Sequence, residues 1–147
     1  MNIAIPAIGV SATITRSPMA DADNLRRTLP GNKTTWLTGP RPDPAQFGPL
    51  GAPVIAGHVA YHGKPAVFAR LAELHAGTTL RITLTDGSAL TYTVYATRRY
   101  PKGALPQSMF APVGDAELRL VTCARANGGH SRFSNNLIVY AVRTGPS

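Results

Sequence analysis

Cysteine is nearly absent from this sequence, since Cys123 is the only thiol among 147 residues. A lone cysteine excludes an internal disulfide and a cysteine-rich zinc site. The chain also lacks any run of about 20 apolar residues, the length that a helix needs to cross a bilayer. The opening MNIAIPAIGV has no charged n-region and no small-residue cleavage site, so it is not an intact signal peptide. Either the protein is cytosolic, or a membrane anchor precedes this sequence.

Acidic residues are scarce: seven Asp and Glu stand against fifteen Lys and Arg, a formal charge of +8. This balance favours anionic surroundings such as nucleic acid, anionic lipid or a phosphate-rich cell wall. The basic residues are dispersed, however, so a soluble basic surface explains them equally well. The triplet Arg98-Arg99-Tyr100 is better explained as a solvated strand end than as a nucleic-acid patch, and we predict no nucleic-acid partner. No acidic cluster is present that would hold calcium.

Thirteen prolines and fourteen glycines indicate many turns and short strands in a single domain, residues 1–147. A compact apolar set at helical spacing predicts one helix, Lys64–His75, and Asp86-Gly87 predicts a two-residue hairpin turn. The three prolines of Arg98–Ala116 predict a long excursion. Many short strands whose edges must be hidden favour a mainly β fold, a closed or nearly closed barrel. The expected strands are Ile3–Val10, Ala12–Thr15, Thr34–Leu37, Pro53–Val59, Thr79–Thr85, Ser88–Thr97, Glu117–Thr122 and Leu137–Val142.

Two residues at strand ends could carry chemistry together. Cys123 follows an apolar strand, and His58 follows Val54-Ile55-Ala56-Gly57. The thiolate is the attacking form of cysteine, so a useful Cys needs a nearby base or cation. A histidine can supply this and then protonate a leaving amine. The pattern predicts a Cys–His dyad, provided that the two strand ends meet.

These motifs resemble the sortase family. Val54–His58 resembles the strand that bears the sortase histidine, and LRLVTC, Leu118–Cys123, resembles the signature that ends in Thr-Cys. The IPAIGV opening, the PAVFARLAEL segment, the TDG hairpin and Tyr100-Pro101-Lys102 are similar in order and spacing. The resemblance covers nearly the whole chain and is nearest to class F sortases of high-GC Gram-positive bacteria.

The resemblance implies a closed eight-stranded β-barrel with one or two short helices. It implies a cysteine transpeptidase that cleaves a C-terminal Leu-Pro-x-Thr-Gly sorting signal between Thr and Gly. The acyl group then passes to an amine of a peptidoglycan precursor, without metal or other cofactor. The implied partners are surface proteins that bear such signals. The implied location is the outer face of the cell membrane, held by an N-terminal anchor outside this sequence.

The resemblance also implies a third catalytic residue, an arginine near the strand after the cysteine. Many sortases carry it directly before an apolar triplet like Leu137-Ile138-Val139, but Asn136 stands there in this chain. Arg132 is therefore the expected residue, and Arg125 is the alternative. The residues expected to contact substrate are Ala56, Leu105, Pro106 and Thr122.

Two other functions stay open at this point. A basic β-barrel that binds polyanions without catalysis would need neither Cys123 nor His58. A purely hydrolytic cysteine peptidase would use the same dyad and gain nothing from added amine.

Overall fold

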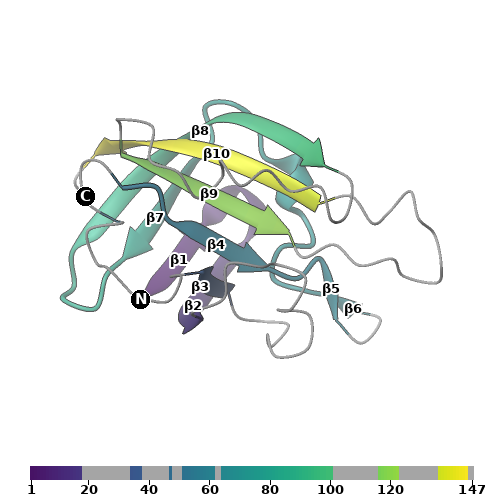
Figure 1. Cartoon of the computed structure of the whole chain (residues 1–147), viewed down its shortest axis with the longest axis horizontal. Coiled ribbons are helices and arrows are strands. Elements are labelled where there is room, and N and C mark those ends of the chain that lie inside the picture. Colours follow the sequence, from purple (N-terminus) through teal and green to yellow (C-terminus); the bar gives the residue numbers. More distant parts are fainter. Residues whose placement is uncertain are drawn as a thin grey trace.

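A computed structural model describes residues 1–17, 34–37, 47, 51–61, 64–100, 116–122 and 136–145. Within these residues eight strands close into a barrel in the order β1-β2-β3-β4-β9-β10-β8-β7, and β7 pairs with β1 (Figure 1). The mainly β fold and the closed eight-stranded barrel are confirmed. The barrel strands are β1 Asn2–Ile5, β2 Val10–Ser17, β3 Thr34–Leu37, β4 Val54–Gly57, β7 Thr79–Thr83, β8 Ala89–Tyr100, β9 Glu117–Thr122 and β10 Asn136–Gly145.

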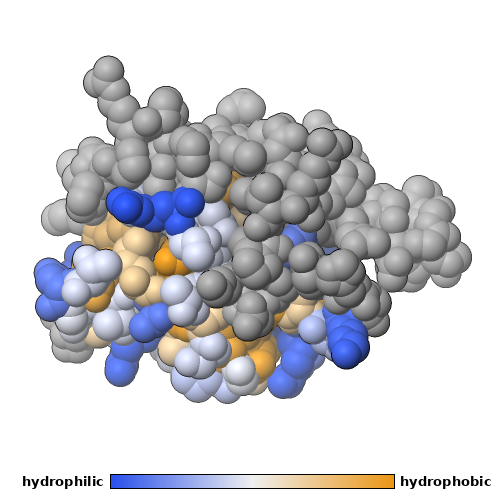
Figure 2. All heavy atoms as spheres, turned by 90° about the horizontal axis from the view of Figure 1, so that it is seen from below, coloured by the Kyte–Doolittle hydropathy of each residue, from blue (hydrophilic) through white to orange (hydrophobic). Residues whose placement is uncertain are grey.

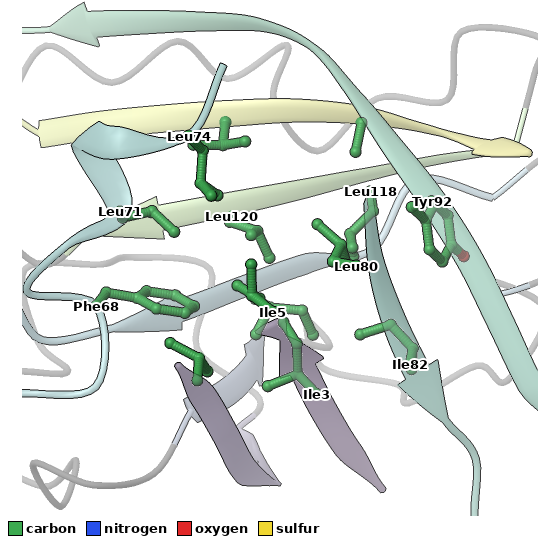
Figure 3. Close-up of a cluster of buried hydrophobic side chains, with 14 of the residues drawn as sticks. Ile3, Ile5, Phe68, Leu71, Leu74, Leu80, Ile82, Tyr92, Leu118 and Leu120 are labelled. Atoms are coloured by element: carbon green, nitrogen blue, oxygen red, sulfur yellow. The ribbon is translucent and has the colours of Figure 1, made fainter. Parts of the chain in front are cut away.

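Side chains that alternate along each strand fill the barrel interior, as closure of a sheet requires. In β7, for example, Leu80 and Ile82 are buried while Thr79 and Arg81 are exposed. Figure 3 shows the inward side chains of strands from opposite sides of the barrel meeting in one cluster. Its labelled members are Ile3, Ile5, Phe68, Leu71, Leu74, Leu80, Ile82, Tyr92, Leu118 and Leu120.

The first predicted strand is wrong in its length. Residues Pro6–Ile8 form a short 3-10 helix, η1, between β1 and β2. Gly9 ends it with a φ of 69° and donates its amide to the Pro6 carbonyl at 3.1 Å. Proline has no amide to give to a strand ladder, and glycine takes the positive φ without strain. The IPAIGV motif is therefore a strand followed by a tight turn.

The predicted two-residue hairpin turn is a three-residue loop. The Leu84 amide donates to the Ser88 carbonyl at 2.8 Å, which leaves Thr85, Asp86 and Gly87 between them. Gly87, at a φ of 90°, donates to the Leu84 carbonyl at 3.0 Å. Three-residue hairpins commonly place one positive-φ residue last, and glycine fits that place.

The predicted helix Lys64–His75 is wrong, although its apolar residues are placed correctly. Phe68, Leu71 and Leu74 are buried in the core. The only regular helix there is η4, a 3-10 helix over Leu71–Glu73, whose flanking amides donate three residues back. Apolar residues spaced by three suit a 3-10 turn as well as an α-helix, so the spacing alone did not decide between them.

Backbone hydrogen bonds to the chain after β4 explain why the helix does not form. Lys64–Pro65 is strand β6, paired with β5, Ala60–Tyr61. The Ala66 amide then donates to the Val59 carbonyl at 3.0 Å. The backbone of residues 64–66 is hydrogen-bonded to residues 59–61, so this segment does not begin a helix. Nowhere in the described residues does a helix have the length and hydrophobicity to cross a membrane.

The predicted excursion Arg98–Ala116 begins too early, because β8 continues to Tyr100. Arg98 and Arg99 are exposed within that strand, and Tyr100 is partly buried. The interpretation of this triplet as a solvated strand end stays a prediction. Residues 101–115 lie outside the described residues.

Gly57 is the last residue of β4, and no larger side chain fits at this position. Its backbone conformation does not require glycine. A Cβ built there would lie 2.7 Å from the Phe68 ring and 3.0 Å from a Val67 methyl group. Phe68 is fully buried, so its ring cannot move aside without disturbing the core.

We expect Gly57→Ala to lower the free energy of unfolding by about 1–3 kcal/mol, the usual cost of overpacking a core. Gly145→Ala is the matched control, because a Cβ there would contact only Thr91 at 3.8 Å. Denaturant unfolding of both variants measures the difference. Equal stability of the two variants would contradict this account of the β4 end.

Candidate active site

Strands β4 and β9 run parallel and in register to their carboxyl ends. The paired residues are Val54 with Arg119, Ile55 with Leu120, Ala56 with Val121 and Gly57 with Thr122. Parallel neighbours need a long crossover connection between them, and here 59 residues lie between the end of β4 at Gly57 and the start of β9 at Glu117. Both strands end at the same end of the barrel (Figure 1).

His58 follows β4 directly and is buried, with 1% of its surface exposed. Its carbonyl accepts a hydrogen bond from the Phe68 amide at 2.9 Å, next to the bond from Ala66 to Val59. Two bonds to adjacent carbonyls fix the backbone at this point. The β4 end is therefore rigid where the sequence predicts a catalytic histidine.

Thr122, predicted to contact substrate, joins β9 to β10 through its side chain. Its Oγ1 accepts a hydrogen bond from the Leu137 amide at 2.8 Å, and Thr122 is 3% exposed. Ile138 pairs with Val121 on the same two strands. The Thr122 hydroxyl thus extends the pairing of β9 with β10 by one residue beyond the Val121–Ile138 pair, and it holds the end of β9 against β10.

Ala56 lies on the outer face of the barrel wall, away from the main core. It belongs to a second buried cluster with Leu37, Val54, Val121 and Ile138, and partly buried Tyr100 and Tyr140 pack against it. This face leads along β4 and β9 to the two strand ends. Of the predicted site residues, the structure therefore describes Ala56, His58 and Thr122 and brings them to neighbouring strand ends. Cys123, Arg132, Leu105 and Pro106, and the alternative Arg125, lie outside the described residues.

A buried polar cluster on the same outer face was missed by the sequence analysis. Arg119 pairs with Glu117 at 3.3 Å, and both are buried. Tyr95 donates its hydroxyl to Glu117 at 2.7 Å, and the Arg119 guanidinium lies over the Tyr140 ring at 5.8 Å. The available signal was the i, i+2 placement of opposite charges in an apolar strand, since such residues share a face.

A β-bulge aims Tyr95 at this cluster. Val94 pairs with Ala141 and Ala96 with Tyr140, so Tyr95 is the extra residue of β8. Bulges commonly redirect one side chain in this way. Partial burial, with the hydrogen bond to Glu117, raises the pKa of Tyr95 to about 12. Its hydroxyl therefore stays protonated and donates at every physiological pH.

Exposed cations occur in different parts of the described chain, among them Arg70, Arg81 and Arg98. On the face drawn in Figure 2, hydrophilic residues stand in several separate places among hydrophobic ones. The ion pair Arg70–Glu73, at 2.9 Å, is an exposed pair that balances one of these cations. Among the described residues, no three His, Cys, Asp or Glu side chains gather as metal ligands would.

A family model described as the sortase domain matches residues 3–144, a span that includes His58, Cys123 and Arg132. The chain belongs to the sortase family, whose members are cysteine transpeptidases of the cell surface. No curated protein sequence matches the chain. The assignment to class F stays a prediction.

Solved sortase structures share this fold. A lid mutant of sortase A from Corynebacterium diphtheriae is 24% identical, with a TM-score of 0.73 over 99% of this chain and 70% of that one. Sortase C2 of pilus island 1 from group B Streptococcus is 19% identical, with a TM-score of 0.75 over 98% and 73%. Sortase C-1 from Actinomyces oris is 22% identical, with a TM-score of 0.73 over 98% and 73%. At these identities the likeness concerns the fold.

Replacing Thr122 with Val should lower the free energy of unfolding by about 1–3 kcal/mol, because the buried Leu137 amide loses its acceptor. Thr122→Ser keeps the oxygen and serves as the control. Hydrogen exchange at the Leu137 amide separates the two, with fast exchange in Thr122→Val and native protection in Thr122→Ser. Native protection in both would show that the hydroxyl does not hold the β9 end.

Proposed function

We propose that this protein is a sortase-type transpeptidase in which Cys123 is the nucleophile and His58 is its acid–base partner. The parallel register of β4 and β9 is the observation that carries the proposal. Cys123 is covalently bonded to Thr122, as His58 is to Gly57. We expect the same register to continue by one step, which would pair His58 with Cys123 on neighbouring strands about 4.8 Å apart.

The outer face of the two strands supports the same pairing. Val54 and Ala56 on β4 face the same side as Val121 on β9. Side chains alternate along a strand, so the next residues on that side are His58 and Cys123. Both reacting side chains are then expected on the outer face of the wall, where a peptide laid along the strands can meet them.

The proposed chemistry has two halves. The Cys123 thiolate attacks the Thr carbonyl of a Leu-Pro-x-Thr-Gly signal, the C–N bond breaks, and His58 protonates the leaving amine of Gly. The product is a thioester to the sulfur. An amine then attacks that carbonyl, a C–N bond replaces the C–S bond, and the thiolate is restored as His58 takes the amine's proton.

The remaining predicted residues have supporting roles in this proposal. Arg132 stabilises the oxyanion through the paired donors of its guanidinium, and Arg125 is the alternative. Leu105 and Pro106 close over the signal. Ala56 offers a small side chain beside the peptide, and Thr122 holds the strand end that carries the nucleophile.

The partners follow from this activity. The donors are surface proteins with a C-terminal Leu-Pro-x-Thr-Gly signal, and the acceptor is an amine of a peptidoglycan precursor. The proposed location is the outer face of the cell membrane, with an N-terminal anchor. No cofactor is needed, because the thiolate and the imidazole supply all the chemistry.

Mixing the protein with a Leu-Pro-x-Thr-Gly peptide should give a covalent adduct on Cys123, detected by mass spectrometry. The mass of the protein should increase by the mass of the peptide less the mass of the released Gly-bearing fragment. Cys123→Ala should give neither adduct nor turnover, yet stay folded, because little buried volume is removed at a strand end. Adding an amine should convert the product from the acid to the amide. Hydrolysis that ignores the amine would support the hydrolytic peptidase instead, and turnover by Cys123→Ala would refute the proposal.

His58→Ala should lose at least about 100-fold in acylation rate, the usual contribution of a positioned acid–base group. His75→Ala is the control, since His75 is exposed and its ring Nδ1 forms a hydrogen bond with the adjacent Ala76 carbonyl. Single-turnover release of the Gly-bearing fragment measures the rate of this step. A loss in His58→Ala no larger than that in His75→Ala would remove His58 from the mechanism.

A further inference from the structure

One row of residues crosses the outer face of the barrel wall at the proposed site. Strands β4, β9, β10 and β8 are neighbours in that order, and all four reach the same end of the barrel (Figure 1). On one side of the row, His58 follows the last residue of β4. On the other side, Asn136, the first residue of β10, pairs with Tyr100, the last residue of β8. The place between His58 and Asn136 is the one that follows Thr122 on β9.

The pairing of β9 with β10 indicates which residue of β10 lies opposite that place. Five consecutive antiparallel pairs run towards the site, and the Leu137 amide then donates to the Thr122 hydroxyl oxygen at 2.8 Å. We expect the next step of this register to bring Asn136 opposite Cys123. Because the Leu137 amide points to β9, the next residue of β10 occupies a non-hydrogen-bonded position, at which facing side chains come closest.

Asn136 and Cys123 also share a face of the sheet. Ile138 on β10 and Val121 on β9 both belong to the outer cluster. Side chains alternate along a strand, so Asn136 lies on the same face as Ile138. For the same reason, Cys123 is expected on the same face as Val121. Leu137 is buried in the interior cluster, as this alternation requires.

Asn136 has the chemistry and the reach to act on a neighbouring sulfur. It is a buried polar residue, with 2% of its surface exposed, and its side-chain amide donates through Nδ2. Facing side chains on paired strands have Cβ atoms about 4.5–5.5 Å apart. The amide nitrogen lies two bonds beyond its Cβ and a cysteine sulfur one bond beyond its own, so the two atoms can meet across this gap. A buried side chain has already lost much of its rotamer freedom in folding, so a hydrogen bond from it costs little further entropy.

We propose that Asn136 donates a hydrogen bond from its side-chain amide to the Cys123 sulfur and thereby favours the thiolate. The role of this contact rests on the proposed transpeptidase function. A donor to the charged form of a group stabilises that form, and the thiolate is the form that attacks the Thr carbonyl. The nucleophile is then held from both neighbouring strands, by His58 from β4 and by Asn136 from β10. When the amine displaces the sulfur from the thioester, the same donor stabilises the departing thiolate.

Alkylation by iodoacetamide tests the contact directly, because Cys123 is the only thiol in the chain. The alkylation rate follows the thiolate fraction, so its pH profile gives the pKa of this thiol. Asn136→Leu removes the donor at nearly the same size and should raise that pKa by about one to two units, which corresponds to a hydrogen bond to a charged group. Asn136→Asp keeps the shape of asparagine and adds a negative charge, so it should raise the pKa further.

Asn2→Asp is the matched control for the charge change. Asn2 is exposed on β1, and three strands separate β1 from β9 in either direction around the barrel. This variant should leave the pKa of the Cys123 thiol unchanged. Thermal unfolding shows that each variant is folded at the assay temperature. A purely structural role of Asn136 would lower the unfolding temperature and leave the pKa of the thiol where it is.

Acylation by the sorting peptide connects the contact to the reaction. At neutral pH, Asn136→Leu should acylate about tenfold more slowly, since one pKa unit changes the thiolate fraction about tenfold while the thiol predominates. Slower acylation with an unchanged pKa of the thiol would overturn the inference and place Asn136 at the substrate carbonyl instead.

The outcomes separate this inference from the function on which it rests. Absence of a thioester in the unmodified protein would overturn the proposed function, whereas the alkylation profiles would still show whether Asn136 contacts Cys123. A normal thioester, with the same pKa of the thiol in Asn136→Leu and Asn136→Asp as in the unmodified protein, would overturn this inference alone. An equal rise in Asn2→Asp would also overturn it, because the effect would then come from overall charge.

Discussion

The parallel pairing of β4 with β9 is the constraint on which the rest of the molecule depends. These strands are far apart in sequence, yet their register runs unbroken to Gly57 and Thr122. A slip by one residue would turn every side chain of β9 to the other face. Leu118 and Leu120 would then leave the core, and Glu117 and Arg119 would enter it. Glu117 would lose its hydrogen bond from Tyr95 and Arg119 its contact with Tyr140. The cost of placing those charges in an apolar interior without these partners secures the register, and with it the alignment of the two strand ends.

Close packing at Gly57 links the core to the proposed chemistry. Phe68 fills the end of the barrel against this glycine, and the same residue's amide binds the His58 carbonyl. Leu71 and Leu74 belong to the same interior cluster as Phe68, and these three side chains form a plug at this end of the barrel. Stability and site geometry therefore share the same contacts, so a change that loosens the plug is expected to move His58 as well.

Sequence patterns predicted strand positions well, because alternation reports directly which side chains face the core. Thr34–Leu37 and Glu117–Thr122 were predicted with the bounds that the structure has. The Lys64–His75 helix was wrong, because its amides bind a segment whose proximity no local pattern reveals. The candidate site was predictable only as two strand ends. That β4 and β9 are neighbours is a long-range fact, and the charged pair Glu117–Arg119 becomes meaningful only on the folded face. The family resemblance supplied what the local patterns lacked.

The alternation of β4 separates two surfaces at its end. Ala56 packs with Val54 and Val121 on the outer face, whereas the Gly57 position meets Val67 and Phe68 on the other side. In the proposed transpeptidase both reacting side chains stand on the outer face, so the donor peptide and the acceptor amine must both approach from there. Water can approach from the same side, and transfer therefore needs the amine held beside the thioester, which removes much of the entropic barrier. The packed side of Gly57 is left to hold the β4 end in place.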